Sequence, residues 1–334
     1  MSKQFADPDV LQDIYNAELS LGSLLQPLGV QFSPVPITGD VGDPGIYNLP
    51  NLSPVTTESV TYTAEGVPVS DTYTGIKLWD LLSDAGAVNV TSAKNDILSK
   101  YVVAIGSDGY KAVFSLGEID PNFGAQPVLV AYADRAGQLG PHGSDGLART
   151  VVPGDQAGGR YVSDLVSLKV GSLPEPGPTG PGGFSDQLTL SGEIAKPETY
   201  TAITLADLHQ PTTETATYIA GTGPVTDTYT GVSLWTLIQD AGLLTDPSIK
   251  NDLLRYGVVA TGSDGYRAII SLGEIDPAFG NQSDLVAYAD TGGQLGPGGS
   301  DWFARLVLPG DHFGGRYVSN LVSLQVVDLS SARS

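Results

Sequence analysis

Cysteine is absent from all 334 residues of the chain. Disulfide bonds, thiolate metal ligands and cysteine nucleophiles are therefore excluded. Long apolar runs are absent too, and none approaches the roughly 20 residues that a membrane-spanning helix needs. We therefore expect no membrane span.

Positive charge is scarce, because 16 Lys and Arg stand against 37 Asp and Glu, giving a net charge of −21. Such a surface repels nucleic acid and anionic membranes, so we expect neither as a partner. The acids are scattered, which predicts a solvated surface, with a Ca²⁺-decorated or high-salt surface as the alternative. Few Lys and many Thr, Ser, Tyr and Gly favour an extracytoplasmic protein, whether periplasmic, cell-surface or secreted. The N-terminal residues 1–8 lack the apolar core of a signal peptide.

The chain repeats itself at a fixed offset of 156 residues. Asp71-Thr-Tyr-Thr-Gly75 returns as Asp227-Thr-Tyr-Thr-Gly231, and no gap is needed between residues 71–170 and 227–326. This pattern indicates a tandem duplication rather than a short-period solenoid. The predicted organisation is a helical N-terminal arm (1–28), copy 1 (29–171), a Pro/Gly linker (172–186), copy 2 (187–328) and a tail (329–334). The arm has no counterpart in copy 2 and is a candidate for self-association.

Each copy shows the same sequence of expected elements. A β-rich stretch precedes a helix that contains Trp79 or Trp235. A second short helix is expected at 92–100 and 247–256, followed by a hairpin and three further strands. Because strands outnumber helices and are mostly near neighbours, we predict an α+β fold with mixed sheets and short helices.

The most regular repeated stretch is Gly106-Ser-Asp-Gly-Tyr110 with Ser115-x-x-Glu118, which recurs from Gly262 to Pro277. Asp-Gly between two apolar runs predicts a tight hairpin with a primed turn. The Ser-x-x-Glu spacing predicts a capping box and a short helical turn. Asp-Pro then ends that turn.

Three motifs in a fixed order resemble the molybdopterin-binding domain of the sulfite oxidase family, most closely its small prokaryotic members. They are Thr74–Leu82, Gly106–Phe114 and Val151–Asp155 with Gly158–Val162, and each recurs in copy 2. The resemblance implies two tandem copies of that domain. It also implies, as an alternative cofactor, molybdopterin.

The chain departs from that family at the positions that would hold the metal and its cofactor. Ala64 and Ala220 stand where the resemblance places the molybdenum-ligating cysteine. Basic cofactor anchors are replaced by Gln156 or His312, and by Ser163 or Ser319. The resemblance therefore implies the fold and argues against oxygen-atom transfer, and we expect no catalytic residue and no metal ligand.

Gly158-Gly159-Arg160 and Gly314-Gly315-Arg316 are the candidate ligand-binding loops. Successive glycine N–H groups beside a guanidinium suit an anion. The structural alternative is that the glycines allow a tight turn while the arginine pairs with Asp155 or Asp311.

Other polar residues give weaker signals. None of the three histidines, His142, His209 and His312, is repeated between the copies. The repeated carboxylates have local structural explanations as turn and cap residues, with a paired-carboxylate hydrolase or a structural Ca²⁺ site as alternatives; they are Asp108/Asp264, Glu118/Glu274, Asp120/Asp276, Asp134/Asp290, Asp145/Asp301 and Asp155/Asp311. Trp302, opposite Gly146, is an asymmetry between the copies.

Three functions remain open from sequence. The favoured one is a non-catalytic binding or structural module. The alternatives are a molybdopterin-binding redox protein without thiolate ligation, and a self-assembling surface or filament subunit.

Overall fold

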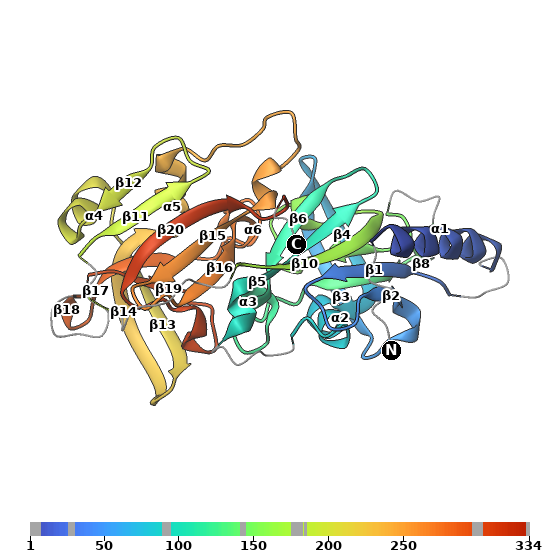
Figure 1. The fold of residues 1–334 in the computed structure, drawn as a ribbon, viewed down its shortest axis with the longest axis horizontal. Helices are drawn as coiled ribbons and strands as arrows, with labels where there is room; N and C mark the ends of the chain where they lie inside the picture. The colour runs from blue at the N-terminus through green and yellow to red at the C-terminus, as the bar shows by residue number, and fades with distance from the viewer. Residues whose placement is uncertain are drawn as a thin grey trace.

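The computed structural model describes residues 8–25, 31–88, 95–140, 145–174, 183, 186–295 and 303–331. Most of the predicted linker lies outside these ranges, as do His142 and Trp302. The described residues form two halves along the long axis of the molecule (Figure 1). Several sheets and few helices make up both halves, which confirms the predicted α+β class.

The first half contains two five-stranded sheets. One has the strand order β2-β1-β10-β5-β6, with β1 and β10 parallel. The other has the order β3-β4-β7-β8, and β9 also pairs with β7. The strands are β1 (Pro34–Gly39), β2 (Gly45–Asn48), β3 (Thr56–Ala64), β4 (Val67–Lys77), β5 (Lys100–Gly106), β6 (Lys111–Ser115), β7 (Leu129–Asp134), β8 (Gly137–Gln138), β9 (Arg149–Val151) and β10 (Leu165–Ser172).

The second half has the same strand order, β12-β11-β20-β15-β16 and β13-β14-β17-β18, with β19 on β17. Registers also repeat, since Thr56 pairs with Gly75 in the first half and Thr212 with Gly231 in the second. The repeat found in the sequence is therefore a repeat of topology. The strands are β11 (Leu188–Gly192), β12 (Glu198–Tyr200), β13 (Thr212–Ala220), β14 (Gly223–Ser233), β15 (Tyr256–Gly262), β16 (Arg267–Ser271), β17 (Leu285–Asp290), β18 (Gly293–Gln294), β19 (Arg305–Val307) and β20 (Leu321–Asp328).

Helix α1 (Pro8–Leu25) is the long helix of the predicted N-terminal arm. It packs against β1 and β2 with Tyr15 buried, at one end of the molecule in Figure 1. The other helices are short: α2 (Leu78–Asp84), α3 (Leu116–Ile119), α4 (Ala202–Leu208), α5 (Leu234–Ala241) and α6 (Leu272–Ile275). Trp79 and Trp235 lie in α2 and α5, half-buried against the core.

The short helices after the hairpins begin as the sequence predicted. The Ser115 hydroxyl accepts a hydrogen bond from the Glu118 N–H at 3.0 Å, and Ser271 accepts from Glu274 N–H at 3.2 Å. The helix in each case ends before the Asp-Pro pair. The two glutamates, however, direct their carboxylates toward arginines, described below.

The predicted primed hairpin turn is wrong. A type I′ turn needs positive φ at both central residues, but only Gly109 and Gly265 adopt it, at 82° and 81°. The turn is longer, with Gly109 N–H bonded to the Gly106 carbonyl and Gly106 N–H bonded to the Tyr110 carbonyl. The Asp108 carboxylate accepts from Tyr110 N–H at 2.9 Å, which favours this wider turn over the primed one.

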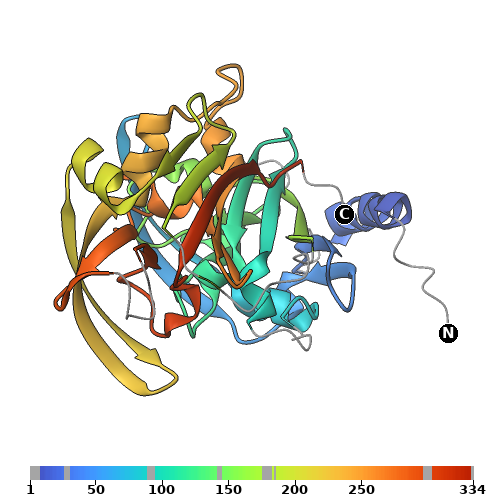
Figure 2. The same cartoon turned by 60° about the vertical axis from the view of Figure 1, so that its left-hand side comes forward.

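Hairpins β3–β4 and β13–β14 extend beyond the body of each half, and β13–β14 projects clearly in Figure 2. Their outer faces carry cross-strand hydroxyl pairs, including Thr215 with Thr228 at 2.9 Å and Ser59 with Thr72 at 2.9 Å. The inner face turns Tyr62 and Tyr218 into the core. This alternation follows from the two-residue period of a strand.

Each half has its own apolar core, and the two cores exchange residues. Leu98 and Phe123 of the first half belong to the core of the second. Leu254 and Phe279 of the second half belong to the core of the first. The halves are therefore packed together reciprocally, about an approximate two-fold axis.

Candidate functional site

The boundary between the halves brings together several residues that the sequence singled out, among them Gln156, His312 and the two Gly-Gly-Arg loops. Backbone hydrogen bonds cross it in both directions. Gln156 N–H donates to the Phe279 carbonyl at 3.1 Å, and His312 N–H donates to the Phe123 carbonyl at 3.1 Å. Each Pro-Gly-Asp loop thus docks on the loop that follows the short helix of the other half.

Two tyrosines bridge the same boundary. The Asn95 amide donates to the Tyr266 hydroxyl at 2.7 Å, and that hydroxyl donates to the Gly315 carbonyl at 2.6 Å. In the other direction, Asn251 donates to Tyr110 at 2.9 Å, and Tyr110 donates to Gly159 at 2.6 Å. The second glycine of each Gly-Gly-Arg loop is therefore an acceptor inside the interface.

The glycines of these loops also leave room for aromatic rings. A Cβ on Gly159 would lie 2.3 Å from the Phe279 ring, and one on Gly315 would lie 2.3 Å from Phe123. Gly158 similarly faces Tyr62 at 2.7 Å. Close approach of the neighbouring half accounts for Gly159 and Gly315, whereas Gly158 makes room for a tyrosine of its own half.

Arg160 and Arg316 are almost completely buried, at 1% and 2% exposure. Arg160 Nε donates to Asp155 Oδ2 at 2.8 Å and Nη2 donates to Oδ1 at 2.6 Å, a bidentate pair. Its Nη1 donates to Glu118. Arg316 makes the equivalent bonds to Asp311 and, at 2.6 Å, to Glu274. The structural alternative, pairing with Asp155 and Asp311, is confirmed, while anion binding by these loops stays a prediction.

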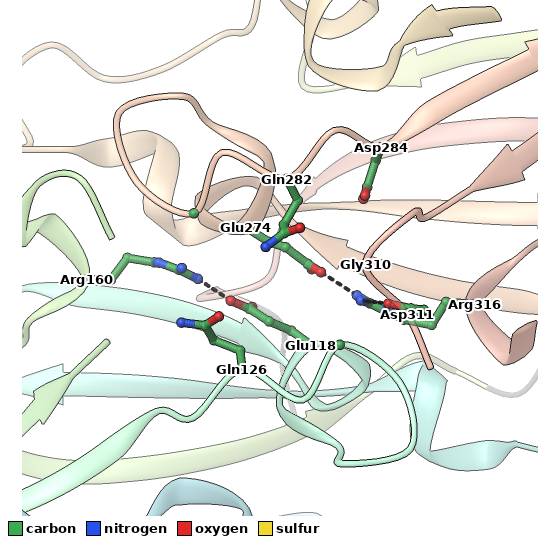
Figure 3. Close-up of a pocket in the computed structure, with 11 residues that line it drawn as sticks. Glu118, Gln126, Arg160, Glu274, Gln282, Asp284, Gly310, Asp311 and Arg316 are labelled. Atoms are coloured by element: carbon green, nitrogen blue, oxygen red, sulfur yellow. Dashed lines mark hydrogen bonds and ion pairs between the residues drawn. The ribbon is translucent and has the colours of Figure 1, made fainter. Parts of the chain in front are cut away.

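These ion pairs surround a cavity of about 50 Å³ between the halves, shown in Figure 3. Four buried carboxyl groups and two guanidinium groups line it: Glu118, Glu274, Asp284 and Asp311 against Arg160 and Arg316. A fifth buried carboxyl group, that of Asp155, pairs with Arg160. The Ser271 hydroxyl crosses the boundary and donates to Glu118 Oε2 at 2.8 Å. The Glu274 Oε2 and Asp284 Oδ2 atoms have no hydrogen-bond partner within the described chain.

Burial governs the charge state of these acids, because water no longer stabilises the carboxylate. It raises the pKa of Asp284 to about 7, against a lowering by Arg316 and a further rise from Asp311 and Glu118. Burial likewise holds the pKa of Glu274 well above its usual range, although Arg316 lowers it. Asp284 has no acidic counterpart, since Val128 occupies its position in the first half.

A larger cavity of about 710 Å³ lies beside this cluster, on the second half. Its walls are the end of the β13–β14 hairpin, the turn at Gly314–Arg316, and Asn95, Asn122 and Phe123 from the first half. Ala220 and Ser319 line it, so two positions assigned by resemblance to a cofactor come together here. Gly314 and Gly315 line it as well.

Arg305 supplies positive charge to the wall of this cavity. Its guanidinium carbon lies 5.4 Å from the Tyr317 ring centroid and 5.7 Å from those of Tyr218 and Tyr229, within cation–π range. Arg305 Nη2 also donates to the Tyr218 hydroxyl at 3.0 Å. The equivalent residue in the first half, Arg149, lies 5.6 Å from the Tyr161 ring.

Two tyrosines that line this cavity keep their phenol protons near neutral pH. Burial raises the pKa of Tyr266 and of Tyr317, so both remain protonated near neutral pH. The carboxylate that lines the cavity, Asp264, accepts the Tyr266 N–H at 2.9 Å. Among the described lining residues there is no His or Lys to act as a base.

Across the described residues, no group of three or more His, Cys, Asp or Glu side chains is arranged to hold a metal ion. None of the described helices is long and apolar enough to cross a membrane. His209 pairs with Asp240 at 3.0 Å, and His312 contacts the Pro121 carbonyl at 3.1 Å, so they lie apart from each other.

Sequence reasoning missed four residues that build the boundary. They are Phe123, Phe279, Asn95 and Asn251. The two phenylalanines pack against glycines of the opposite half, and the two asparagines donate hydrogen bonds to tyrosines of the opposite half. Both pairs are related by the 156-residue offset. In the structure the two asparagines adopt positive φ, at 55° and 51°. Repetition was the available signal, but it does not distinguish a folding role from an interface role.

Comparisons with known protein sequences identify no family for the chain. No protein-family profile matches the chain, and no curated protein matches it. Among solved structures, it is similar to the sulfane dehydrogenase SoxCD from Paracoccus pantotrophus, with 15% sequence identity and a TM-score of 0.33. The match covers 70% of this chain and 57% of that chain, so it spans little more than half of that structure.

Proposed function

We propose that the chain is a non-catalytic binding protein of extracytoplasmic type, with its ligand site in the 710 Å³ cavity of the second half. The observation that carries this proposal is the combination of volume and lining. The volume lies within the range of ligand pockets, and both halves contribute to the walls. Aromatic rings with a few polar groups are typical of such sites.

The lining suits a small organic anion that contains a ring. Tyr317, Tyr218 and Phe313 offer aromatic surface, and Arg305 offers positive charge. Ser319 and Asn320 add hydrogen-bonding groups at the same wall. Among the described lining residues, Tyr266 and Tyr317 stay neutral near neutral pH and Asp264 is the one carboxylate, a set that favours binding over acid–base catalysis.

A second candidate is a molybdopterin held without thiolate ligation, on a duplicated sulfite-oxidase-like fold. It is favoured by one observation, the meeting of Ala220, Ser319 and the Gly314-Gly315 pair at this cavity. The donor set fits the cofactor poorly. Ala220 offers a methyl group, and Ser319 offers a hydroxyl where a polyanionic cofactor would need a cation. Self-assembly through the N-terminal arm remains a third possibility, to be tested by the mass of the protein in solution.

Native mass spectrometry of protein from its source organism tests the binding proposal. We expect a bound small anion that is lost in Arg305→Gln and retained in Arg149→Gln, the matched change in the first half. Elemental analysis of the same samples tests the second candidate. Absence of any bound molecule, or equal loss in both variants, contradicts the assignment of the ligand to this cavity. Near-stoichiometric molybdenum or tungsten supports the cofactor instead.

A further inference from the structure

The small cavity between the halves contains more negative than positive groups. Five carboxyl groups and two guanidinium groups are each at most 4% exposed, so solvent cannot balance their charge. Asp155, Asp311, Glu118 and one oxygen of Glu274 are paired with arginines. With all five acids ionised, three negative charges would have no cation to balance them. Within the cluster, the buried oxygens without a hydrogen-bond partner in the described chain are Asp284 Oδ2 and Glu274 Oε2.

Two kinds of positive species balance such a charge, a metal ion or a proton. Figure 3 shows the guanidinium group of Arg160 bonded to Glu118, and that of Arg316 bonded to Glu274 beside Asp311. No three described carboxylates converge on one point as metal ligands. A protonated carboxyl group needs no such convergence, and it is the usual response of a buried acid without a partner.

We propose that Asp284 and Glu274 hold protons in the folded chain, and that this proton-binding site couples the packing of the two halves to pH. The groups that face it come from both halves. Arg316 and Asp311 belong to the same half as the two acids, whereas Glu118 and Arg160 come from the other. Loss of a proton places a carboxylate beside Glu118 and Asp311 in a space with no further cation among the described residues.

The equivalent position in the first half shows which side chain is sufficient for packing at position 284. Val128 occupies the place of Asp284, at 1% exposure, and is followed by the same Leu-Val sequence. A valine therefore satisfies the strand and the core at this position. Aspartate at this position adds an ionisable group whose Oδ2 has no hydrogen-bond partner within the described chain.

The test compares the full chain with Asp284→Val and Asp284→Asn, with the exposed Asp207→Asn as control. Thermal unfolding is followed from pH 4 to pH 8. An acid with a raised folded pKa keeps its proton in the folded chain while the unfolded chain loses it, so wild-type stability falls between pH 3.8 and about 7. Relative to Asp284→Val, the wild-type melting temperature should fall by roughly 5–10 °C over this window. Asp207→Asn should show no such difference.

Two further measurements separate a proton from a metal and test the coupling. The infrared carbonyl band of a protonated carboxylic acid should be present in the wild type at pH 6 and weaker in Asp284→Val and Asp284→Asn. Hydrogen-exchange protection of the Gln156 and His312 amides, which bond across the boundary, should fall above pH 7 by more in the wild type than in Asp284→Val, which retains only Glu274. A pH-independent difference between wild type and both variants overturns the proposal. So does stabilisation of the wild type, and not of Asp284→Val, by added Na⁺ or Ca²⁺ without the infrared band.

Discussion

Gly273 and Arg160 fit against each other across the boundary, because a Cβ built on Gly273 would lie 2.6 Å from Cδ of Arg160. Gly117 has the same relationship to Arg316, also at 2.6 Å. Each arginine stem occupies the space that a side chain would take on the facing short helix. Since both arginines are anchored by two carboxylates, the stem cannot move aside easily.

Gly273→Ala should therefore destabilise the chain. The added methyl group meets an anchored side chain in a packed interface, which costs about 1–3 kcal/mol and outweighs the better helix propensity of alanine, at most about 1 kcal/mol. Urea unfolding measures the change, and Gly117→Ala should behave alike. Gly140→Ala is the control, because nothing lies within 4 Å of a Cβ there. Equal effects at Gly273 and Gly140 would contradict this packing.

Removal of the Arg160 side chain should be more costly. Arg160→Ala leaves Asp155 and Glu118 buried without their cation, a loss of about 3–5 kcal/mol. Arg135→Ala is the comparison, because the Arg135 side chain is 68% exposed and pairs with Asp71 only at 3.6 Å. It should cost at most about 1 kcal/mol. Thermal shifts with sulfate, phosphate and molybdate complete the test: anion binding lost in Arg160→Ala without loss of stability would support the loop as an anion site.

Tyr266→Phe should weaken the packing of the two halves, because it removes the hydroxyl oxygen that joins them. The change leaves the Gly315 carbonyl without its donor and the Asn95 amide without its acceptor, which we expect to cost about 1–3 kcal/mol. Tyr110→Phe should match it in the other direction. Tyr288→Phe serves as control, since that half-buried ring packs on the same core and its hydroxyl has no hydrogen bond to a described residue. Chemical unfolding of the four proteins decides; no difference between Tyr266→Phe and Tyr288→Phe would show that the bridge contributes nothing.

Alkaline pH should destabilise the folded chain through Tyr15. Burial raises the pKa of Tyr15 to about 12, with a smaller contribution from Asp164. Between about pH 10 and 12 the unfolded chain loses this proton while the folded chain retains it, so stability falls as pH rises. Unfolding measured across that range should fall less steeply in Tyr15→Phe than in the wild type. Identical slopes would show that Tyr15 is not shielded from water.

The sequence predicts the fold class and the repeat because both depend on local periodicity and on identity between positions. The cap at Ser115 was predictable for the same reason, as its partner lies three residues away. The ion pair of the Glu118 carboxylate was not predictable, because its partner Arg160 lies 42 residues further along the chain and is positioned by a different loop. Phe123 and Phe279 were harder still, since their function depends on contact with the other half. Residue patterns contain no information on which repeated glycine faces a neighbour.

The difference between Val128 and Asp284 shows what fusion into one chain permits. In a dimer of identical subunits, every substitution at the interface appears twice, so an aspartate added to one subunit would also be added to the other. Covalent linkage of two copies removes that constraint, because each position is encoded separately. One side of the boundary can then acquire an ionisable residue while the other keeps a hydrocarbon. The chain can carry a single acid on one side of the boundary, an arrangement that no symmetric pair of subunits can reach by mutation.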